Sequence, residues 1–222
     1  MSFNYKTKPY KHQEEALLRS FNRKNYAYFM EMGCGKSKVL IDNITWLYQE
    51  KEIDTAIIIA PKGVYMNWKN AEIPTHLPDD VPNNVYVWKA SANKTEKKIL
   101  EEGVKTRDKL RILLVNVEAF ATAKVIRYLE AFTHRSNFML AVDESTTIKN
   151  IKAKRTKAIL KLGQSAKYKR ILTGSPITQS PMDLYSQCYF LDKDLLGFDS
   201  YWSFQGRYAI IRQTRIGNHS FQ

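Results

Sequence analysis

YAYFMEMGCGKSKVLI, residues Tyr26 to Ile41, joins an apolar run to an amphipathic pattern through a turn that carries two glycines, a lysine and a hydroxyl. Gly33 and Gly35 allow backbone amides to approach an anion closely. A helix that begins near Lys36 directs the positive end of its dipole at the same place. The stretch therefore predicts a strand, a phosphate-binding turn and a helix in that order.

The turn fits only the short form of the nucleotide-binding motif. The full pattern, G-x-x-x-x-G-K-[ST], has a glycine where this chain has Met30. The alternative is a strand-to-helix turn whose glycines only save space. Because the turn directly follows an apolar strand and opens a helix, nucleotide binding is the favoured interpretation, with Lys36 on the β and γ phosphates and Ser37 on Mg²⁺.

Outward from this turn, apolar segments alternate with segments of helical spacing. The helical segments are 36–49, 118–132 and the stripe of Ile151, Ala158, Ile159 and Leu162. Strands that are apolar on both faces and separated by helices indicate a mainly parallel sheet covered on both sides. The sequence thus predicts an α/β fold. The expected strands are 27–30, 55–60, 85–88, 111–117, 138–142 and 170–173.

Composition restricts the functional class. The chain has 222 residues, 44% of them hydrophobic, and 35 Lys plus Arg exceed 22 Asp plus Glu to give a net charge of +13. Such a surface favours polyanionic partners. No apolar run is long enough to span a bilayer, and MSFNYKTKPY lacks the apolar core of a signal peptide. We therefore expect a soluble, cytoplasmic protein that does not bind membranes.

Two adjacent acids follow the strand expected at 138–142. Asp143 and Glu144 stand just past its carboxyl end, the side on which parallel sheets of this kind bind ligands. One carboxylate can hold Mg²⁺ while its neighbour deprotonates an attacking water. In isolation the pair would fit an ordinary surface turn. Together with the upstream phosphate turn, it predicts a catalytic site formed by Lys36, Asp143 and Glu144.

Five segments together resemble the first, RecA-like motor lobe of helicase superfamily two, closest to the Swi/Snf-related branch and its compact bacterial and phage-borne members. The resemblance covers residues 5–191. The segments are YKHQEEALLRSF (10–21), MEMGCGKSKVL (30–40), IIIAPKGVYMNWKNAE (57–72), VDESTTIKN (142–150) and RILTGSPITQSPMDLYSQCYFL (170–191).

The resemblance implies a site for Mg-ATP. Asp143 and Ser37 would hold the metal, and Glu144 would activate water. Gln13 matches the glutamine that reads adenine, and Lys36 matches the phosphate-binding lysine. The residues expected around the nucleotide are Gln13, Met32, Gly33, Cys34, Gly35, Lys36, Ser37 and Lys38.

The resemblance also implies a nucleic-acid partner, with DNA the expected form. Pro61 and Lys62 match residues that touch the phosphate backbone in such lobes. The element Thr173–Gly174–Ser175 matches the one that links the nucleotide site to nucleic acid. Thr146 and Thr147 depart from the family, which usually has His and commonly Arg there, and this puts in doubt how hydrolysis couples to movement.

The resemblance predicts a lobe at residues 1–191 and an extension at 192–222 that leads toward a second RecA-like lobe, supplied in cis or in trans. We expect an ATP hydrolase that moves on DNA, weak or inactive without that second lobe, in a bacterium or a phage-infected cell. Two alternatives stay open: a nucleotide-gated nucleic-acid-binding module without turnover, and a small-molecule kinase. Segment 148–170, with nine Lys or Arg and no acid, is expected to present a basic face to nucleic acid.

Overall fold

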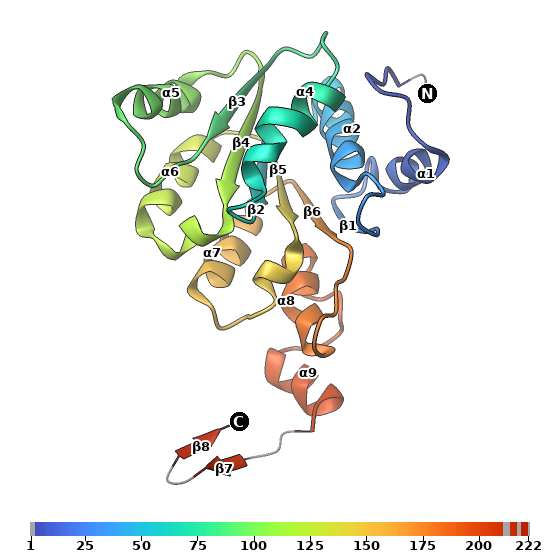
Figure 1. Ribbon diagram of the computed structural model, residues 1–222, viewed down its shortest axis with the longest axis vertical. Helices are drawn as coiled ribbons and strands as arrows, with labels where there is room; N and C mark the ends of the chain where they lie inside the picture. The colour runs from blue at the N-terminus through green and yellow to red at the C-terminus, as the bar shows by residue number, and fades with distance from the viewer. Residues whose placement is uncertain (1–2, 211–213, 217–218, 222) are drawn as a thin grey trace.

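A six-stranded, wholly parallel sheet forms the centre of the molecule (Figure 1). The computed structural model describes residues 3–210, 214–216 and 219–221. Along the sheet the strands follow the order β1-β6-β5-β2-β4-β3, and this arrangement confirms the α/β expectation. The strands are β1 (Asn25–Phe29), β2 (Thr55–Ala60), β3 (Asn83–Val87), β4 (Leu110–Asn116), β5 (Phe138–Asp143) and β6 (Tyr168–Thr173).

Helices cover both faces of this sheet. α2 starts at Lys36 and ends at Gln49, as its apolar spacing predicts. The α-helices are α1 (Lys11–Ser20), α2 (Lys36–Gln49), α3 (Tyr65–Asn67), α4 (Ile73–His76), α5 (Lys94–Lys105), α6 (Ala123–Thr133), α7 (Lys154–Gly163), α8 (Met182–Leu191) and α9 (Tyr201–Tyr208). Shorter turns of other helical types are η1 (Trp68–Glu72), η2 (Val117–Ala121) and η3 (Ser145–Ile148).

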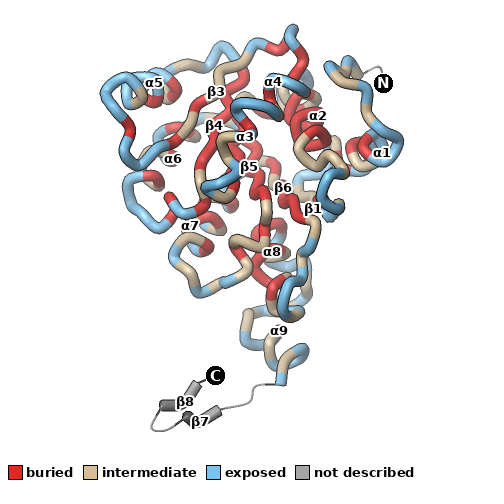
Figure 2. Tube along the Cα trace, viewed as in Figure 1, coloured by how far each residue is buried: buried red, intermediate tan, exposed pale blue. Residues whose placement is uncertain are grey.

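The central strands are buried on both sides, as Figure 2 shows in red. Alternate residues of one strand face opposite ways, so Ile58 packs in the core under α1 and α2, while Ile57 packs in the core under α5 to α8. This double burial explains why the strands read as continuous apolar runs rather than as alternating ones.

The prediction of a single helix over 118–132 is wrong. The structure divides this segment into η2 and α6, which meet at Thr122. The Asn116 side chain accepts a hydrogen bond from the Ala119 amide (2.8 Å) and caps the first turn. Thr122 then takes an extended conformation (φ −112°, ψ 141°) and interrupts the helical path. The apolar periodicity of the sequence continues across Thr122, so this pattern could not reveal the break.

The basic segment 148–170 is less exposed than its composition suggests. Arg170 is wholly buried and donates hydrogen bonds to Asn43 and to the Ser20 carbonyl. Lys149 and Lys167 form ion pairs with Asp183 and Glu52. Four lysines, at 152, 154, 157 and 161, remain exposed. The expected basic face is therefore confined to α7 and the loop before it.

Residues after β6 leave the sheet. α8 packs back on it, and α9 continues away from it to a two-stranded antiparallel pair, β7 (Thr214–Ile216) and β8 (His219–Phe221) (Figure 1). Aromatic contacts, including Tyr185 with Phe204 at 5.4 Å between ring centroids, join α8 to α9. Every helix in the described ranges is too short or too polar to cross a lipid bilayer.

Candidate nucleotide site at the carboxyl edge of the sheet

The phosphate turn has the backbone conformation that its glycines suggest. Gly33 and Gly35 have φ angles of 80° and 78°, in the left-handed region that residues with a Cβ atom rarely occupy. Gly35 is also the N-cap of α2, and its carbonyl accepts the Val39 amide at 3.2 Å. The amides of the first turn of α2 therefore remain available to an anion.

Gln13 lies directly against this turn. Its Nε2 donates to the Cys34 carbonyl at 3.1 Å, and its Oε1 accepts the Tyr10 amide at 3.0 Å. A Cβ added at Gly35 would lie only 2.3 Å from Gln13 Nε2. Gly35 is thus required twice, by its backbone angle and by the close approach of Gln13. His12, which the sequence did not single out, also contacts the Cys34 carbonyl through Nε2 at 3.0 Å.

The two lysines of the turn face different surroundings. Lys36 Nζ donates to the carbonyls of Met30 and Glu31, at 3.0 and 3.1 Å, and so lies over the turn. Lys38 instead turns into the interior and pairs with Asp42 at 2.8 Å. Its side chain therefore points away from the turn. The Met32 side chain is exposed at the tip of the turn.

Asp143 ends β5 and is nearly buried. Its Oδ2 accepts a hydrogen bond from Trp68 Nε1 at 2.9 Å, and its Oδ1 accepts the Glu144 amide at 3.0 Å. Burial raises the pKa of Asp143, while the Trp68 hydrogen bond and the positive charge of Lys36 act in the opposite direction. β1 and β5 both run parallel to β6, so the phosphate turn after β1 and the acid at the end of β5 lie at the same edge of the sheet.

Trp68 is the residue whose role the sequence missed. Its side chain is 1% exposed and packs in the core. It opens η1, a π-helical turn, a rare element that often marks functional sites. No sequence pattern announces the bond from its indole to an acid 75 positions away, because the contact exists only once β2 and β5 are paired.

Glu144 has an unusual backbone. Its φ and ψ are 47° and 61°, one of three non-glycine residues with positive φ among those described. This conformation costs on the order of 1 kcal/mol for a residue with a Cβ atom and clusters at functional positions. It turns the chain sharply from β5 into η3, so that adjacent acids take different surroundings: Asp143 is buried and Glu144 is half-exposed.

The Thr173–Gly174–Ser175 element borders the same turn. β6 lies between β1 and β5, with Phe29 beside Thr173 and Asp143 beside Leu172. A Cβ built on Gly174 would lie 3.5 Å from the Met30 carbonyl oxygen and from the Met32 amide. Ser175 is exposed, and its amide donates to Thr173 Oγ1 at 3.2 Å. This element is therefore in contact with the phosphate turn.

Pro61 and Lys62 follow β2 at the same edge. Ile59 of β2 is paired with Val142 of β5, so the residues that follow each strand emerge side by side. The Pro61 carbonyl accepts the amides of Val64 and Tyr65, and Lys62 is exposed. The carboxyl edge of the sheet thus carries four candidate segments, which follow β1, β2, β5 and β6. Gln13 of α1 packs against the first of them, the phosphate turn.

A polar network links the segment after the acids to the segment after Ser175. Gln187 of α8 accepts from Ser145 through Oε1 and donates to the Pro176 carbonyl at 2.8 Å. Asp183 Oδ2 accepts from the amides of Thr178 and Gln179, at 2.9 and 2.8 Å, and from Thr178 Oγ1 at 2.7 Å. Lys149 completes the network with hydrogen bonds to Thr178 and Gln179.

Known sequences resemble this chain over most of its length. Residues 17–215 match the SNF2-related domain. The chain is 29% identical over 163 residues to a probable ATP-dependent DNA helicase, CHR12, of Arabidopsis thaliana, covering 72% of this chain and 14% of that protein. It is 28% identical over 180 residues to the lymphoid-specific helicase of Homo sapiens, covering 81% of this chain and 20% of that one. The chain thus spans a small part of these relatives.

Solved structures agree in fold. The SWI2/SNF2 ATPase core of Sulfolobus solfataricus in complex with dsDNA superposes with a TM-score of 0.72 at 24% identity, covering 94% of this chain and 40% of that one. The same core domain in a second structure gives 0.62 at 25% identity, with 92% and 40% coverage. The fold is therefore the RecA-like fold of such cores. With nearly its whole length matched by the family, the chain belongs to the SNF2-related domain family.

Proposed function

We propose that the chain is the ATP-binding lobe of a DNA-dependent ATPase that uses hydrolysis to move along DNA. The observation that carries the proposal is the meeting of two motifs at one sheet edge. The phosphate turn follows β1, Asp143 and Glu144 stand at the end of β5, and both of these strands pair in parallel with β6. Membership in the SNF2-related family supports the same conclusion.

In this proposal, each residue of the turn contributes to holding the triphosphate. Amides around Gly35 and the ammonium of Lys36 bind the phosphate oxygens. Lys36 must leave the carbonyls of Met30 and Glu31 to do so, exchanging two neutral acceptors for charged ones, which form stronger hydrogen bonds. Gln13, whose side chain is held against the turn by its bond to the Cys34 carbonyl, would bind the adenine.

Asp143 and Ser37 fit Mg²⁺. Their carboxylate and hydroxyl oxygens are the hard donors that this ion takes, and it usually completes its shell with water and phosphate oxygens. Bound Mg²⁺ would neutralise charge on the β and γ phosphates.

Glu144 is the proposed general base. In this proposal the carboxylate of Glu144, which is half-exposed beside the buried Asp143, takes a proton from the water that attacks the γ phosphorus. The new bond joins the water oxygen to phosphorus, and the bond to the β–γ bridging oxygen breaks, which leaves ADP and phosphate.

DNA is the proposed track, with Pro61 and Lys62 on its backbone and the Thr173–Gly174–Ser175 element reporting the state of the nucleotide. The contact of Gly174 with the phosphate turn supports this coupling role. We further propose that residues 1–191 form the lobe and 192–222 an extension toward a second RecA-like lobe. A bacterial or phage source remains a prediction, since the relatives and structures named above are eukaryotic and archaeal.

Two variants test the assigned roles. Glu144→Gln should bind Mg-ATP normally and lose turnover about 100-fold or more, because only proton transfer is removed. Lys36→Ala should lose nucleotide affinity. Phosphate release and equilibrium nucleotide binding are measured with and without duplex DNA, for this chain and for one that includes a second lobe.

The outcomes separate the candidate functions. DNA-stimulated phosphate release that Glu144→Gln abolishes supports a motor ATPase. ATP-dependent DNA binding without release, in both the short and the long chain, would assign the protein instead to nucleotide-gated nucleic-acid binding. Normal hydrolysis by Glu144→Gln in the two-lobed chain would show that Glu144 is not the base.

A further inference from the structure

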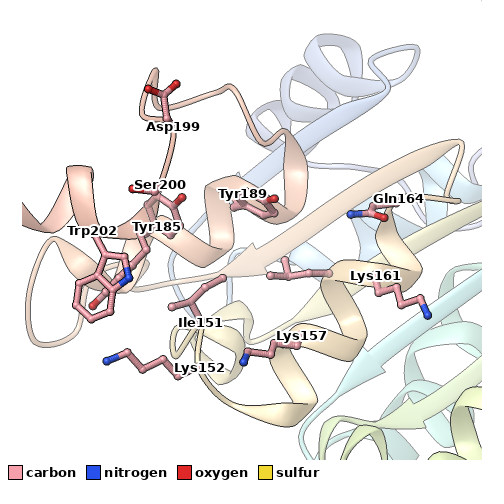
Figure 3. Close-up of a pocket in the computed structure, with 12 residues that line it drawn as sticks. Ile151, Lys152, Lys157, Lys161, Gln164, Tyr185, Tyr189, Asp199, Ser200 and Trp202 are labelled. Carbon is pink, nitrogen blue, oxygen red and sulfur yellow. The ribbon is translucent and has the colours of Figure 1, made fainter.

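A pocket of about 500 Å³ opens between α7 and the α8–α9 pair (Figure 3). It shares no residue with the phosphate turn or with the acids after β5. Its volume lies in the range of small-molecule sites, a few hundred Å³. The residues that line it are Ile151, Lys152, Lys157, Leu160, Lys161, Gln164, Tyr185, Tyr189, Asp199, Ser200, Tyr201 and Trp202.

The two walls of the pocket differ chemically. Lys152, Lys157 and Lys161 come from α7 and the loop before it, whereas α8 and α9 supply four aromatic rings. Trp202 is 60% exposed, and Lys152 Nζ lies 4.6 Å from the centroid of its ring. In Figure 3 these two side chains lie next to each other, and Asp199 lies on the far side from the lysines.

The charge in the pocket is not balanced from within. Three lysines line it against one aspartate. None of the three lysines forms an ion pair with a side chain in the described part of the chain. An apolar peptide would leave these lysines uncompensated. A ligand with an aromatic ring and a phosphate would satisfy both walls, since bases stack on aromatic side chains and phosphates bind lysine.

We propose that this pocket binds a segment of single-stranded nucleic acid, with a base stacked against Trp202 and its flanking phosphates on Lys157 and Lys161. A base inside a duplex is already stacked and cannot reach the aromatic wall, so the pocket selects an unpaired strand. The inference relies on the nucleic-acid partner proposed above, but it does not depend on ATP hydrolysis.

Binding of a fluorescein-labelled oligo(dT) of about ten nucleotides, followed by anisotropy over a salt series, tests the lysine wall. The variant Lys152→Gln/Lys157→Gln/Lys161→Gln should weaken binding and reduce the slope of log K against log salt by about 1.4, from the two phosphate contacts of Lys157 and Lys161 that are lost. The matched control is Lys94→Gln/Lys97→Gln/Lys98→Gln, which removes the same charge from exposed positions of α5. This variant should leave both the affinity and the salt slope close to those of the wild type.

Trp202 supplies the local readout. Trp202→Ala should weaken oligo(dT) binding about tenfold, whereas Trp202→Phe, which keeps a stacking surface, should retain most of the affinity. The wild-type protein should also lose tryptophan fluorescence on binding, and Trp202→Phe should not. Lys36→Ala should bind the strand like the wild type, so a failure of the nucleotide site cannot be mistaken for a failure of this pocket.

Four results would overturn the proposal. Equal losses in both triple-lysine variants would mean that only overall charge matters. Unchanged binding by Trp202→Ala, or equal affinity for a duplex of the same length, would exclude a stacked base. Displacement of oligo(dT) by dTMP, with no preference for the longer strand, would assign the pocket to free nucleotides.

Discussion

Trp68 and Asp143, 75 positions apart in the chain, form a hydrogen bond that orients the carboxylate of Asp143, the candidate metal ligand. The carboxylate is 7% exposed, so an unpartnered oxygen there would be costly. The indole N–H satisfies Oδ2 and fixes the plane of the group, and the Glu144 amide satisfies Oδ1. Each oxygen keeps a second lone pair, and the acid is oriented before any ligand binds.

Trp68→Phe should therefore impair the metal site more than it impairs the fold. It removes the N–H donor and keeps most of the aromatic volume, at a cost of about 1.5–3 kcal/mol for a hydrogen bond to a charged group. We expect a higher Mg²⁺ concentration for half-maximal ATP hydrolysis in a two-lobed chain. A Mg²⁺ titration at saturating ATP measures this effect.

Trp88→Phe is the matched control. Trp88 is 4% exposed, but its Nε1 has no hydrogen-bond partner among the described residues. Its replacement should cost packing alone and leave the Mg²⁺ requirement unchanged. An identical Mg²⁺ requirement in both variants would show that Trp68 acts on the core and not on Asp143.

At the scale of elements, side chains of α8 form hydrogen bonds both with the segment after β6, at Thr178 and Gln179, and with the segment after β5, at Ser145. Asp183, in the first turn of α8, accepts hydrogen bonds from Thr178 and Gln179, and Lys149 lies 3.5 Å away. Burial alone would raise the pKa of Asp183. The hydrogen bonds from Thr178 and Gln179 and the charge of Lys149 outweigh it and lower the pKa to about 2.

A carboxylate whose pKa is depressed on folding stabilises the native state above its unfolded pKa, here 3.8. That contribution is lost as the pH falls through about 2. We expect Asp183→Asn to lower the free energy of unfolding by about 2 kcal/mol at neutral pH, with the difference from wild type shrinking below about pH 4. Urea titrations across this pH range measure the difference. Asp108→Asn, at an exposed position, should follow the wild type, and a constant difference for Asp183→Asn down to pH 2 would contradict the assignment.

At the scale of the whole molecule, one ligand would touch segments that the chain separates widely. Gln13 precedes β1, the phosphate turn follows it, and Asp143 ends β5. Because all of these belong to one doubly covered sheet, binding should stabilise the lobe as a unit. Mg-ATP at 100 times its Kd should add about 2.7 kcal/mol, or a rise in Tm of roughly 5–10 °C.

Two variants sharpen this measurement. Glu144→Gln should keep the rise in Tm, because it retains all binding contacts, and Lys36→Ala should lose it. Differential scanning fluorimetry with and without Mg-ATP gives both values. The same rise in Lys36→Ala would place the nucleotide elsewhere on the molecule.

Much of the fold could be predicted because the strands are buried on both faces. Thr55–Ala60 and Lys36–Gln49 match their expected limits, since uninterrupted apolar runs and a glycine turn leave little choice. The break at Thr122 could not be predicted, because the apolar spacing continues across this residue although its backbone is extended. Arg170 belonged both to an expected strand and to the basic segment, and its partners Asn43 and Ser20, which are far away in the chain, could not be predicted.

The sequence alone determined the chemistry at each strand end, because turn glycines, a lysine and adjacent acids are local signals. The tertiary structure alone decided which of these groups meet. It placed β6 between β1 and β5, set the indole of Trp68 on Asp143, and turned Lys38 inward to Asp42. It also formed the pocket between α7 and α9. Such contacts join residues far apart in the chain, and they follow from strand order and packing, which no local pattern encodes.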